Sequence, residues 1–336
     1  MVYAHRDDIF DADTHMMEHP DWIHQFADKS IQDKLEPIAE GDKDVRLRID
    51  NAIKGFEERQ SSPDVLEKAK EEFMGWKHKG WDGLGAFNAE ERKLANDLLG
   101  FKAHLVFPTS AFDQVLAAKE PKVILGGVEA LNKGMAEFCS VDKRMFGAAY
   151  IPFSYGEEVA LNILKQSIQQ GSKVILIDTI APEGTKAFTH PDFDVVWKTI
   201  QDNDITITLH VGADNSWDPV PLSFYNNGSE VPPHKEGDAP RDALAYMGIS
   251  YNAELFLASM IFDGVFDRFP LLRIGVVELG ASWIISWMKH LDQSYRAFRR
   301  LQDLSGVKML PSEYVQKHIK ITPFPGEDIG WLLESG

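Results

Sequence analysis

Short runs of apolar and β-branched residues recur along the chain, separated by longer segments in which apolar residues repeat with helical spacing. Seven of these runs predict strands, at residues 9–13, 102–107, 145–151, 173–177, 205–209, 273–277 and 318–321. The run at 173–177 is almost continuously apolar, as in strands that are buried on both faces. Strands that alternate with helices predict repeated βα units and a parallel sheet.

Signals for helix ends agree with this pattern. Asn88 followed by Glu91 fits an N-cap with a glutamate three residues later, so a helix is expected to begin there and lead into the second strand. Residues 155–170 predict a helix that ends at Gly171. Residues 194–203 predict another, which leads directly into the fifth strand.

Two regions are longer than bare βα units need. Residues 22–85 are charged and mostly helical in pattern, which predicts a helical insertion after the first strand. Residues 212–247 hold a long polar loop after the fifth strand. Loops of that length in compact domains are usually lids or binding loops, so this one is a possible lid.

The element order favours an α/β protein of the TIM (β/α)8 barrel type, with residues 1–336 as a single domain. Such a barrel closes with eight strands, but only a helix at 327–334 follows the seventh predicted strand. We therefore expect that strand 8 is missing from this sequence and that the chain is a fragment of a longer protein.

Composition narrows the classes of partner. The 336 residues include 35 Lys and Arg against 52 Asp and Glu, a formal net charge of −17, which argues against nucleic-acid binding because that requires basic patches. The amino terminus lacks the apolar core of a signal peptide, and no run reaches the roughly 18 apolar residues that span a bilayer. Cys139 is the single cysteine, so the sequence favours a reducing, cytoplasmic location, with this thiol acting as a small buried hydrophobe.

Candidate metal ligands stand at the ends of predicted strands. Asp13 and His15 alternate along the first strand, so both are expected on one side of its carboxyl end, where a carboxylate and an imidazole suit zinc or manganese. A hydrogen-bonded loop pair is the alternative for these two. His210 follows the fifth strand, and in a barrel all strand carboxyl ends meet at one face. That convergence favours a metal site over a structural histidine.

Glu278 follows the sixth strand at the same expected rim. It is a candidate general acid or base, or a fourth ligand. A carboxylate that caps the helix expected near Ala281 is an equally acceptable interpretation.

Together these motifs resemble the amidohydrolase-related metal enzymes, in the branch similar to aminocarboxymuconate-semialdehyde decarboxylase. The resemblance depends on DADTH at 11–15 with Glu18, on the stretch from His190 to Trp197 that leads to His210, and on residues 262–290. It implies that Asp13, His15 and His210 bind a divalent metal, most readily zinc with manganese as an alternative. It also implies a further Asp on strand 8, beyond Gly336, and a possible homodimer.

Other residues are candidates for contact with a small-molecule substrate. His234 and Arg241 lie in the long loop after strand five, where they could meet an acidic substrate, although solvated loop charges are the alternative. Phe107, at the end of strand two, could line the pocket or belong to the core.

The sequence thus predicts a metal-dependent hydrolase or carboxy-lyase acting on a small carboxylated or cyclic organic substrate. Hydrolysis would use a metal-activated water, whereas non-oxidative decarboxylation would use the metal to hold the substrate and a nearby acid to protonate carbon. The competing hypothesis is a catalytically silent, open-barrel binding protein, suggested by the missing strand and by Glu278 where relatives often have His.

Overall fold

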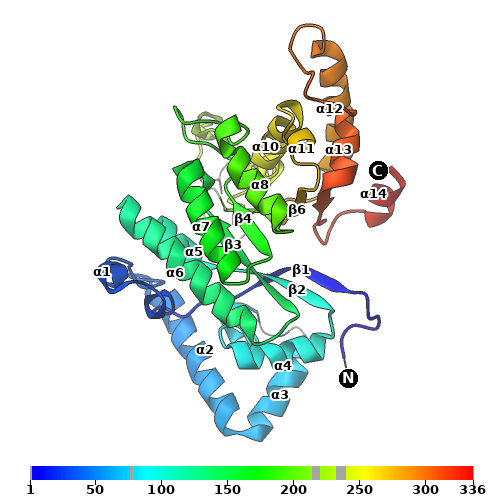
Figure 1. The fold of residues 1–336 in the computed structure, drawn as a ribbon. Helices are drawn as coiled ribbons and strands as arrows, with labels where there is room; N and C mark the ends of the chain where they lie inside the picture. The colour runs from blue at the N-terminus through cyan, green and yellow to red at the C-terminus, as the bar shows by residue number, and fades with distance from the viewer. Residues whose placement is uncertain (1, 76, 78, 214–219, 232–239, 336) are drawn as a thin grey trace. The chain divides into compact units, whose positions relative to one another are not determined.

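A computed structural model describes residues 2–75, 77, 79–213, 220–231 and 240–335, and it forms two compact units. The first comprises Met1–Tyr150 and Gln169–Lys173, and the second comprises Ile151–Ile168 and Val174–Gly336. Figure 1 labels many of the helices and strands of both units. Each unit contains parallel strands and helices, and each is described separately below.

The sheet of the first unit has three parallel strands in chain order, β1 (Phe10–His15), β2 (Ala103–Phe107) and β3 (Met145–Ile151). The register of β1 against β2 shifts between Asp11, which pairs with His104, and Thr14, which pairs with Val106. This bulge places one extra residue in β1, a device that re-aims side chains near functional sites. The helical elements of this unit are η1 (Ile23–Gln25), α1 (Lys29–Gln32), α2 (Lys43–Ser61), α3 (Pro63–Met74), η2 (Gly80–Asp82), α4 (Ala89–Leu99), α5 (Ser110–Leu116) and α6 (Pro121–Ser140).

The segment at 22–85 is mostly helical, as its pattern predicts, and charged contacts attach it to α4. Arg59 of α2 donates two hydrogen bonds to the carboxylate of Glu91, at 2.7 and 3.0 Å; the Glu91 side chain is buried and that of Arg59 is 10% exposed. Glu91 also accepts from the amide of Gly85, and Arg92 donates to the Gly85 carbonyl oxygen. Since Arg92 also donates to the carbonyl oxygen of His15, this cluster connects the insertion to the end of β1.

The sheet of the second unit has four parallel strands in chain order, β4 (Val174–Ile177), β5 (Thr206–His210), β6 (Arg273–Val277) and β7 (Ile319–Ile321). The helical elements of this unit are η3 (Phe153–Tyr155), α7 (Glu157–Gln169), η4 (Pro191–Phe193), α8 (Asp194–Asp202), η5 (Leu222–Tyr225), α9 (Ala243–Gly248), α10 (Tyr251–Phe262), α11 (Val265–Arg268), α12 (Trp283–Phe298), α13 (Pro311–His318) and α14 (Ile329–Ser335).

Aromatic rings form much of the core of the second unit. The Phe153 ring lies 5.1–5.6 Å, between centroids, from the rings of Phe188, Phe193 and Trp197. The Trp197 indole is fully buried, and its Nε1 donates to the Phe188 carbonyl oxygen at 2.9 Å. Its polar atom is therefore satisfied, as buried tryptophans require.

All seven predicted strands are present, and β3 and β6 have the predicted bounds. Within the described residues no strand follows β7, and α14 is the last element. The long loop after β5 contains η5 and all but the last residue of α9. Its positions 214–219 and 232–239, including His234, lie outside the described residues. No helix in the described part of the chain is both long enough and apolar enough to cross a membrane.

Candidate active site

Asp13 and His15 stand together at the carboxyl end of β1. His15 Nε2 lies 3.3 Å from Asp13 Oδ1, and the two side chains are 19% and 31% exposed. The amide of Asp13 donates to Asp11 Oδ1 at 3.1 Å, which fixes the backbone where β1 bulges. The strand therefore presents a carboxylate and an imidazole side by side, as the sequence predicts.

The other nitrogen of His15 faces the loop after β2. Register pairs His15 with Phe107, so Thr109 stands two residues further along, and its Oγ1 lies 3.0 Å from His15 Nδ1. The Phe107 ring packs against the imidazole, with centroids 5.8 Å apart. Because Phe107 is only 1% exposed, its burial favours the core alternative over direct contact with a substrate.

Glu18 is a fully buried carboxylate three residues beyond His15. Burial raises the pKa of Glu18 from 4.5 to about 7, although hydrogen bonds from the amides of Thr109 and Ala111 act in the opposite direction. Those amides donate to Oε1 and Oε2 at 3.0 and 3.1 Å. Glu18 thus binds the backbone at the beginning of α5.

His210 ends β5 with a nearly buried side chain that is 6% exposed. Its Nδ1 lies 2.9 Å from the Val211 carbonyl oxygen. Because a carbonyl oxygen only accepts, Nδ1 carries the proton, and Nε2 of the neutral ring is left as a lone-pair donor. Metal-binding histidines are commonly oriented in this way, by a carbonyl or carboxylate on the nitrogen opposite the metal.

Glu278 stands next to His210 because β5 and β6 pair in register. His210 is level with Val277, and Glu278 Oε2 lies 3.4 Å from His210 Nε2. Glu278 has a φ of +55°, a left-handed conformation that is unfavourable for a side chain of this kind. Its amide donates to Thr322 Oγ1 at 3.2 Å, which supports that conformation. Strained residues of this sort cluster at active sites.

A different carboxylate fills the capping role that was an alternative for Glu278. Glu327 accepts hydrogen bonds from the amides of Ala281 and Ser282, just before α12, and from the amide of Phe324. Burial alone would raise the pKa of Glu327, but these hydrogen bonds outweigh it and hold the pKa below its ordinary value. The amides just before α12 therefore donate to Glu327 and not to Glu278.

Arg241 lies just before α9, with its guanidinium carbon 6.0 Å from the centroid of the Tyr225 ring. The Tyr225 hydroxyl donates to Asp242 Oδ1 at 3.3 Å, and the same oxygen accepts from the amide of Ala245. Arg241 thus lies beside the hydrogen-bonded contact between Tyr225 and Asp242.

One further buried carboxylate was missed in the sequence. Asp178 follows β4, is 3% exposed, and accepts a hydrogen bond from the amide of Ser154 at 2.7 Å. An ionisable residue directly after an apolar run is the signal that identified Glu278, and it would have identified Asp178 as well.

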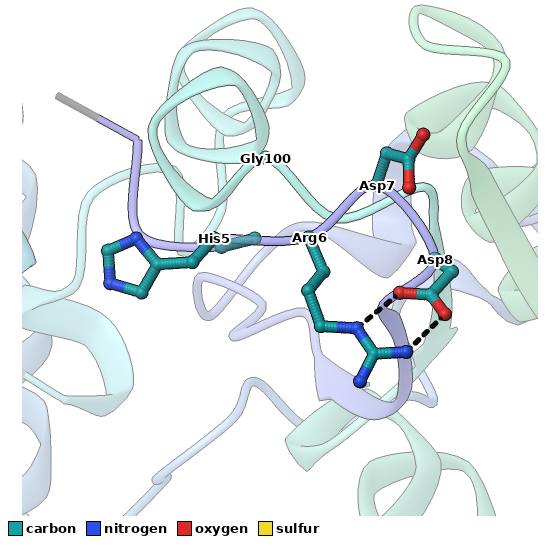
Figure 2. Close-up of a pocket in the computed structure, with 6 residues that line it drawn as sticks. His5, Arg6, Asp7, Asp8 and Gly100 are labelled. Carbon is teal, nitrogen blue, oxygen red and sulfur yellow. Dashed lines mark hydrogen bonds and ion pairs between the residues drawn. The ribbon is translucent and has the colours of Figure 1, made fainter.

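The amino-terminal segment forms a hollow of about 690 Å³ in the first unit (Figure 2). It is lined by Ala4, His5, Arg6, Asp7, Asp8 and Gly100. Arg6 Nε and Nη2 pair with Asp8 Oδ1 and Oδ2 at 2.8 and 2.5 Å, so the two charges neutralise each other. This hollow lies before the amino ends of β1 and β2 and contains none of the predicted site residues.

The Asp13–His15 pair and the His210–Glu278 pair have side chains of the types that bind a divalent metal. Carboxylate oxygen and imidazole nitrogen are ligands of both zinc and manganese. In each pair the histidine Nε2 lies within 3.4 Å of a carboxylate oxygen, and Nδ1 faces a protein oxygen. The donor atoms present therefore fit a metal cofactor.

Solved structures with a similar fold are named as an amidohydrolase and as decarboxylases, and two of them contain manganese. An amidohydrolase from Mycobacterium avium subsp. paratuberculosis K-10 matches with 15% identity over 99% of this chain and 86% of its own, with a TM-score of 0.70. A 5-carboxyvanillate decarboxylase from Novosphingobium aromaticivorans DSM 12444, with bound manganese, matches with 16% identity over 96% and 82%, with a TM-score of 0.56. A dihydroxybenzoic acid decarboxylase from Polaromonas sp. JS666, with manganese and 2-nitroresorcinol, matches with 16% identity over 76% and 74%, also at 0.56.

These similarities confirm the predicted α/β barrel class and, at the level of the fold, the predicted resemblance to the amidohydrolase-related enzymes. No family model and no curated protein matches the chain.

Proposed function

We propose that this chain is a metal-dependent enzyme of the amidohydrolase superfamily that removes carbon dioxide from a small aromatic carboxylate without oxidation. The observation that carries the proposal is the pairing of histidine and carboxylate at strand ends, Asp13 with His15 and His210 with Glu278. In a closed parallel barrel the carboxyl ends of all strands meet at one face, so the two pairs would serve one metal. The similar fold of manganese-containing decarboxylases supports this choice of reaction.

Asp13, His15 and His210 are the proposed metal ligands. A bound divalent ion would polarise a carboxylate or carbonyl oxygen of the substrate. The ligand types suit zinc and manganese alike, and the metal named in two of the similar structures is manganese. Zinc remains our proposal from the sequence resemblance, with manganese as the alternative that the relatives favour.

Glu278 is the proposed general acid and base. Its carboxyl group would deliver a proton to the ring carbon as the bond to the departing carboxylate breaks, and the electron pair of that bond would remain on the ring carbon. Solvent would then restore the proton to Glu278. General acids of this kind contribute about 10²- to 10⁴-fold in rate. The left-handed backbone of Glu278 supports this role, because such strain is retained where function needs it.

Arg241 is the proposed partner of a substrate carboxylate, since its planar guanidinium can bind a carboxylate with two hydrogen bonds. His234 stays a proposal from the sequence for the same task. Hydrolysis of an amide, ester or lactone is the second candidate reaction, because the similar structure with the TM-score of 0.70 is named only as an amidohydrolase. The names of these similar structures are those of enzymes, which favours an enzyme over the catalytically silent binding protein.

The test is release of carbon dioxide from 2,6-dihydroxybenzoate and 5-carboxyvanillate by protein that has been stripped with a chelator and reloaded with Mn²⁺ or Zn²⁺. We expect metal-dependent release that His210→Ala abolishes and that Glu278→Gln lowers by about 10²-fold or more while metal remains bound. Loss of metal in Glu278→Gln would instead make Glu278 a ligand. His190→Ala is the matched control, because His190 lies in an exposed turn before α8.

Equal release by wild type and His210→Ala would contradict the proposal. Cleavage of amides or lactones without release of carbon dioxide would favour hydrolysis instead.

Two further proposals concern the cellular location and the oligomeric state of the enzyme. The single cysteine, Cys139, is buried, and burial raises the pKa of its thiol to about 12, so it behaves as an inert core residue. A chain without an internal disulfide supports a cytoplasmic location. A homodimer is proposed from the sequence resemblance, and light scattering after gel filtration would test it.

A further inference from the structure

The loop between β2 and α5 makes a hydrogen-bonded contact with the proposed ligand His15. Thr109 Oγ1 lies 3.0 Å from His15 Nδ1 and 2.8 Å from the carbonyl oxygen of Met16. Thr109 is partly buried, and so are both of these contacts.

The single proton of the Thr109 hydroxyl decides the direction of the hydrogen bond between Thr109 Oγ1 and His15 Nδ1. A threonine hydroxyl has one proton to donate, and the Met16 carbonyl oxygen can only accept, so that proton is directed to Met16. Thr109 Oγ1 must then accept from His15 Nδ1. A neutral imidazole with its proton on Nδ1 has its lone pair on Nε2, the atom that faces Asp13.

Glu18 holds Thr109 in the position that this arrangement needs. Its two carboxylate oxygens accept from the amides of Thr109 and Ala111, and the carboxylate itself is fully buried. The carbonyl group of Met16 is fixed as well, because the Met16 amide donates to the Phe107 carbonyl oxygen at 2.9 Å. The backbone is therefore fixed on both sides of the hydrogen bond from the Thr109 hydroxyl to the Met16 carbonyl oxygen.

We propose that Thr109, held by Glu18, is a positioning residue that keeps His15 in the tautomer with its proton on Nδ1 and presents Nε2 to the metal. The inference depends on the proposed function in taking His15 as a ligand. His210 reaches the same tautomer through the carbonyl oxygen of Val211, so the chain orients both histidines through Nδ1. Groups that orient metal-binding histidines typically contribute about 10- to 100-fold in metal affinity.

Three variants of the full chain separate positioning from folding. Thr109→Val keeps the shape but removes the hydroxyl group, and Thr109→Ser restores the hydroxyl group on a smaller side chain. Thr185→Val is the matched control, because the Thr185 hydroxyl is exposed and donates only locally, to the Pro182 carbonyl oxygen. Thermal unfolding of each variant shows whether the fold is retained.

The first measurement is the ¹⁵N spectrum of histidine-labelled, metal-free protein at pH 8, with His15→Asn used to assign the signal. We expect His15 in wild type and Thr109→Ser to show a protonated Nδ1, and His15 in Thr109→Val to show a mixture of tautomers. A proton on Nε2 in wild type, or an unchanged tautomer in folded Thr109→Val, would overturn the inference.

The second measurement is the Mn²⁺ affinity of the same proteins by competition with a chelator. We expect affinity to fall about 10- to 100-fold in Thr109→Val and to recover in Thr109→Ser. Equal affinity in wild type and Thr109→Val would also overturn the inference. Absence of Mn²⁺ and Zn²⁺ binding by wild type would contradict the proposed function, whereas the tautomer of the metal-free protein would still decide the role of Thr109.

Discussion

Replacement of Glu18 by glutamine gives a sharp test of the electrostatics around the site. The Glu18 side chain is fully buried, and burial raises its pKa from 4.5 to about 7. The folded protein therefore binds a proton that the unfolded chain has already lost between those pH values. Stability falls as the pH rises through this window, because ionised Glu18 must remain buried in the folded state.

The change in the free energy of unfolding follows from the size of the pKa shift of Glu18. Each pKa unit corresponds to about 1.4 kcal/mol, so a rise from 4.5 to about 7 corresponds to about 3 kcal/mol over the whole window. Roughly 1 kcal/mol of this is lost between pH 6 and pH 8. Glutamine does not titrate, but its amide group leaves the amide of Thr109 or Ala111 without an acceptor, at a pH-independent cost of about 1–3 kcal/mol.

The assay is urea unfolding of chelator-treated wild type and Glu18→Gln at several pH values from 6 to 8. We expect the deficit of Glu18→Gln to shrink by about 1 kcal/mol as the pH rises, because only wild type loses stability through Glu18. Glu57→Gln, at an exposed position on α2, should run parallel to wild type. Parallel profiles for wild type and Glu18→Gln would refute the reasoning.

Two further predictions concern the attachment of the helical insertion. Arg59→Ala should lower the free energy of unfolding by about 3–5 kcal/mol in chemical denaturation, because it leaves Glu91 as an uncompensated buried charge. A loss no larger than that of the control Arg46→Ala, whose side chain is 39% exposed, would contradict this. Gly85→Ala should prevent stable folding, judged by soluble yield and melting temperature, because Gly85 has a φ of +73° and an added Cβ would lie 2.4 Å from Arg92 Cα. A normal melting temperature for Gly85→Ala would show that the Gly85 turn is not as tightly packed as described.

The strands were predictable to the extent that the apolar pattern alone determines them. β3 and β6 are mostly apolar and keep their predicted bounds. β1 has the sequence FDADTH, which lacks an apolar run, and the structure extends it to His15, beyond its predicted end. Pairing with β2, together with the bulge after Asp11, sets its end, and neither is encoded in local periodicity.

Part of the candidate site was predictable because it stands at strand ends. Asp13 lies two residues before the end of β1, His15 and His210 end β1 and β5, and Glu278 follows β6. A reader of the sequence can recognise such positions. The contact of Glu18 with Thr109 joins positions 91 residues apart, and no spacing rule connects them. The left-handed backbone of Glu278 is equally invisible in the sequence, since it depends on the neighbouring Thr322.

The most direct test of the central claim is the metal content of the purified chain, measured by elemental mass spectrometry for wild type, Asp13→Ala and His210→Ala. We predict about one zinc or manganese ion per wild-type chain and loss of the ion in both variants, because Asp13 and His210 are both proposed ligands. A folded wild-type chain without bound metal after loading, or full metal content in both variants, would contradict the account.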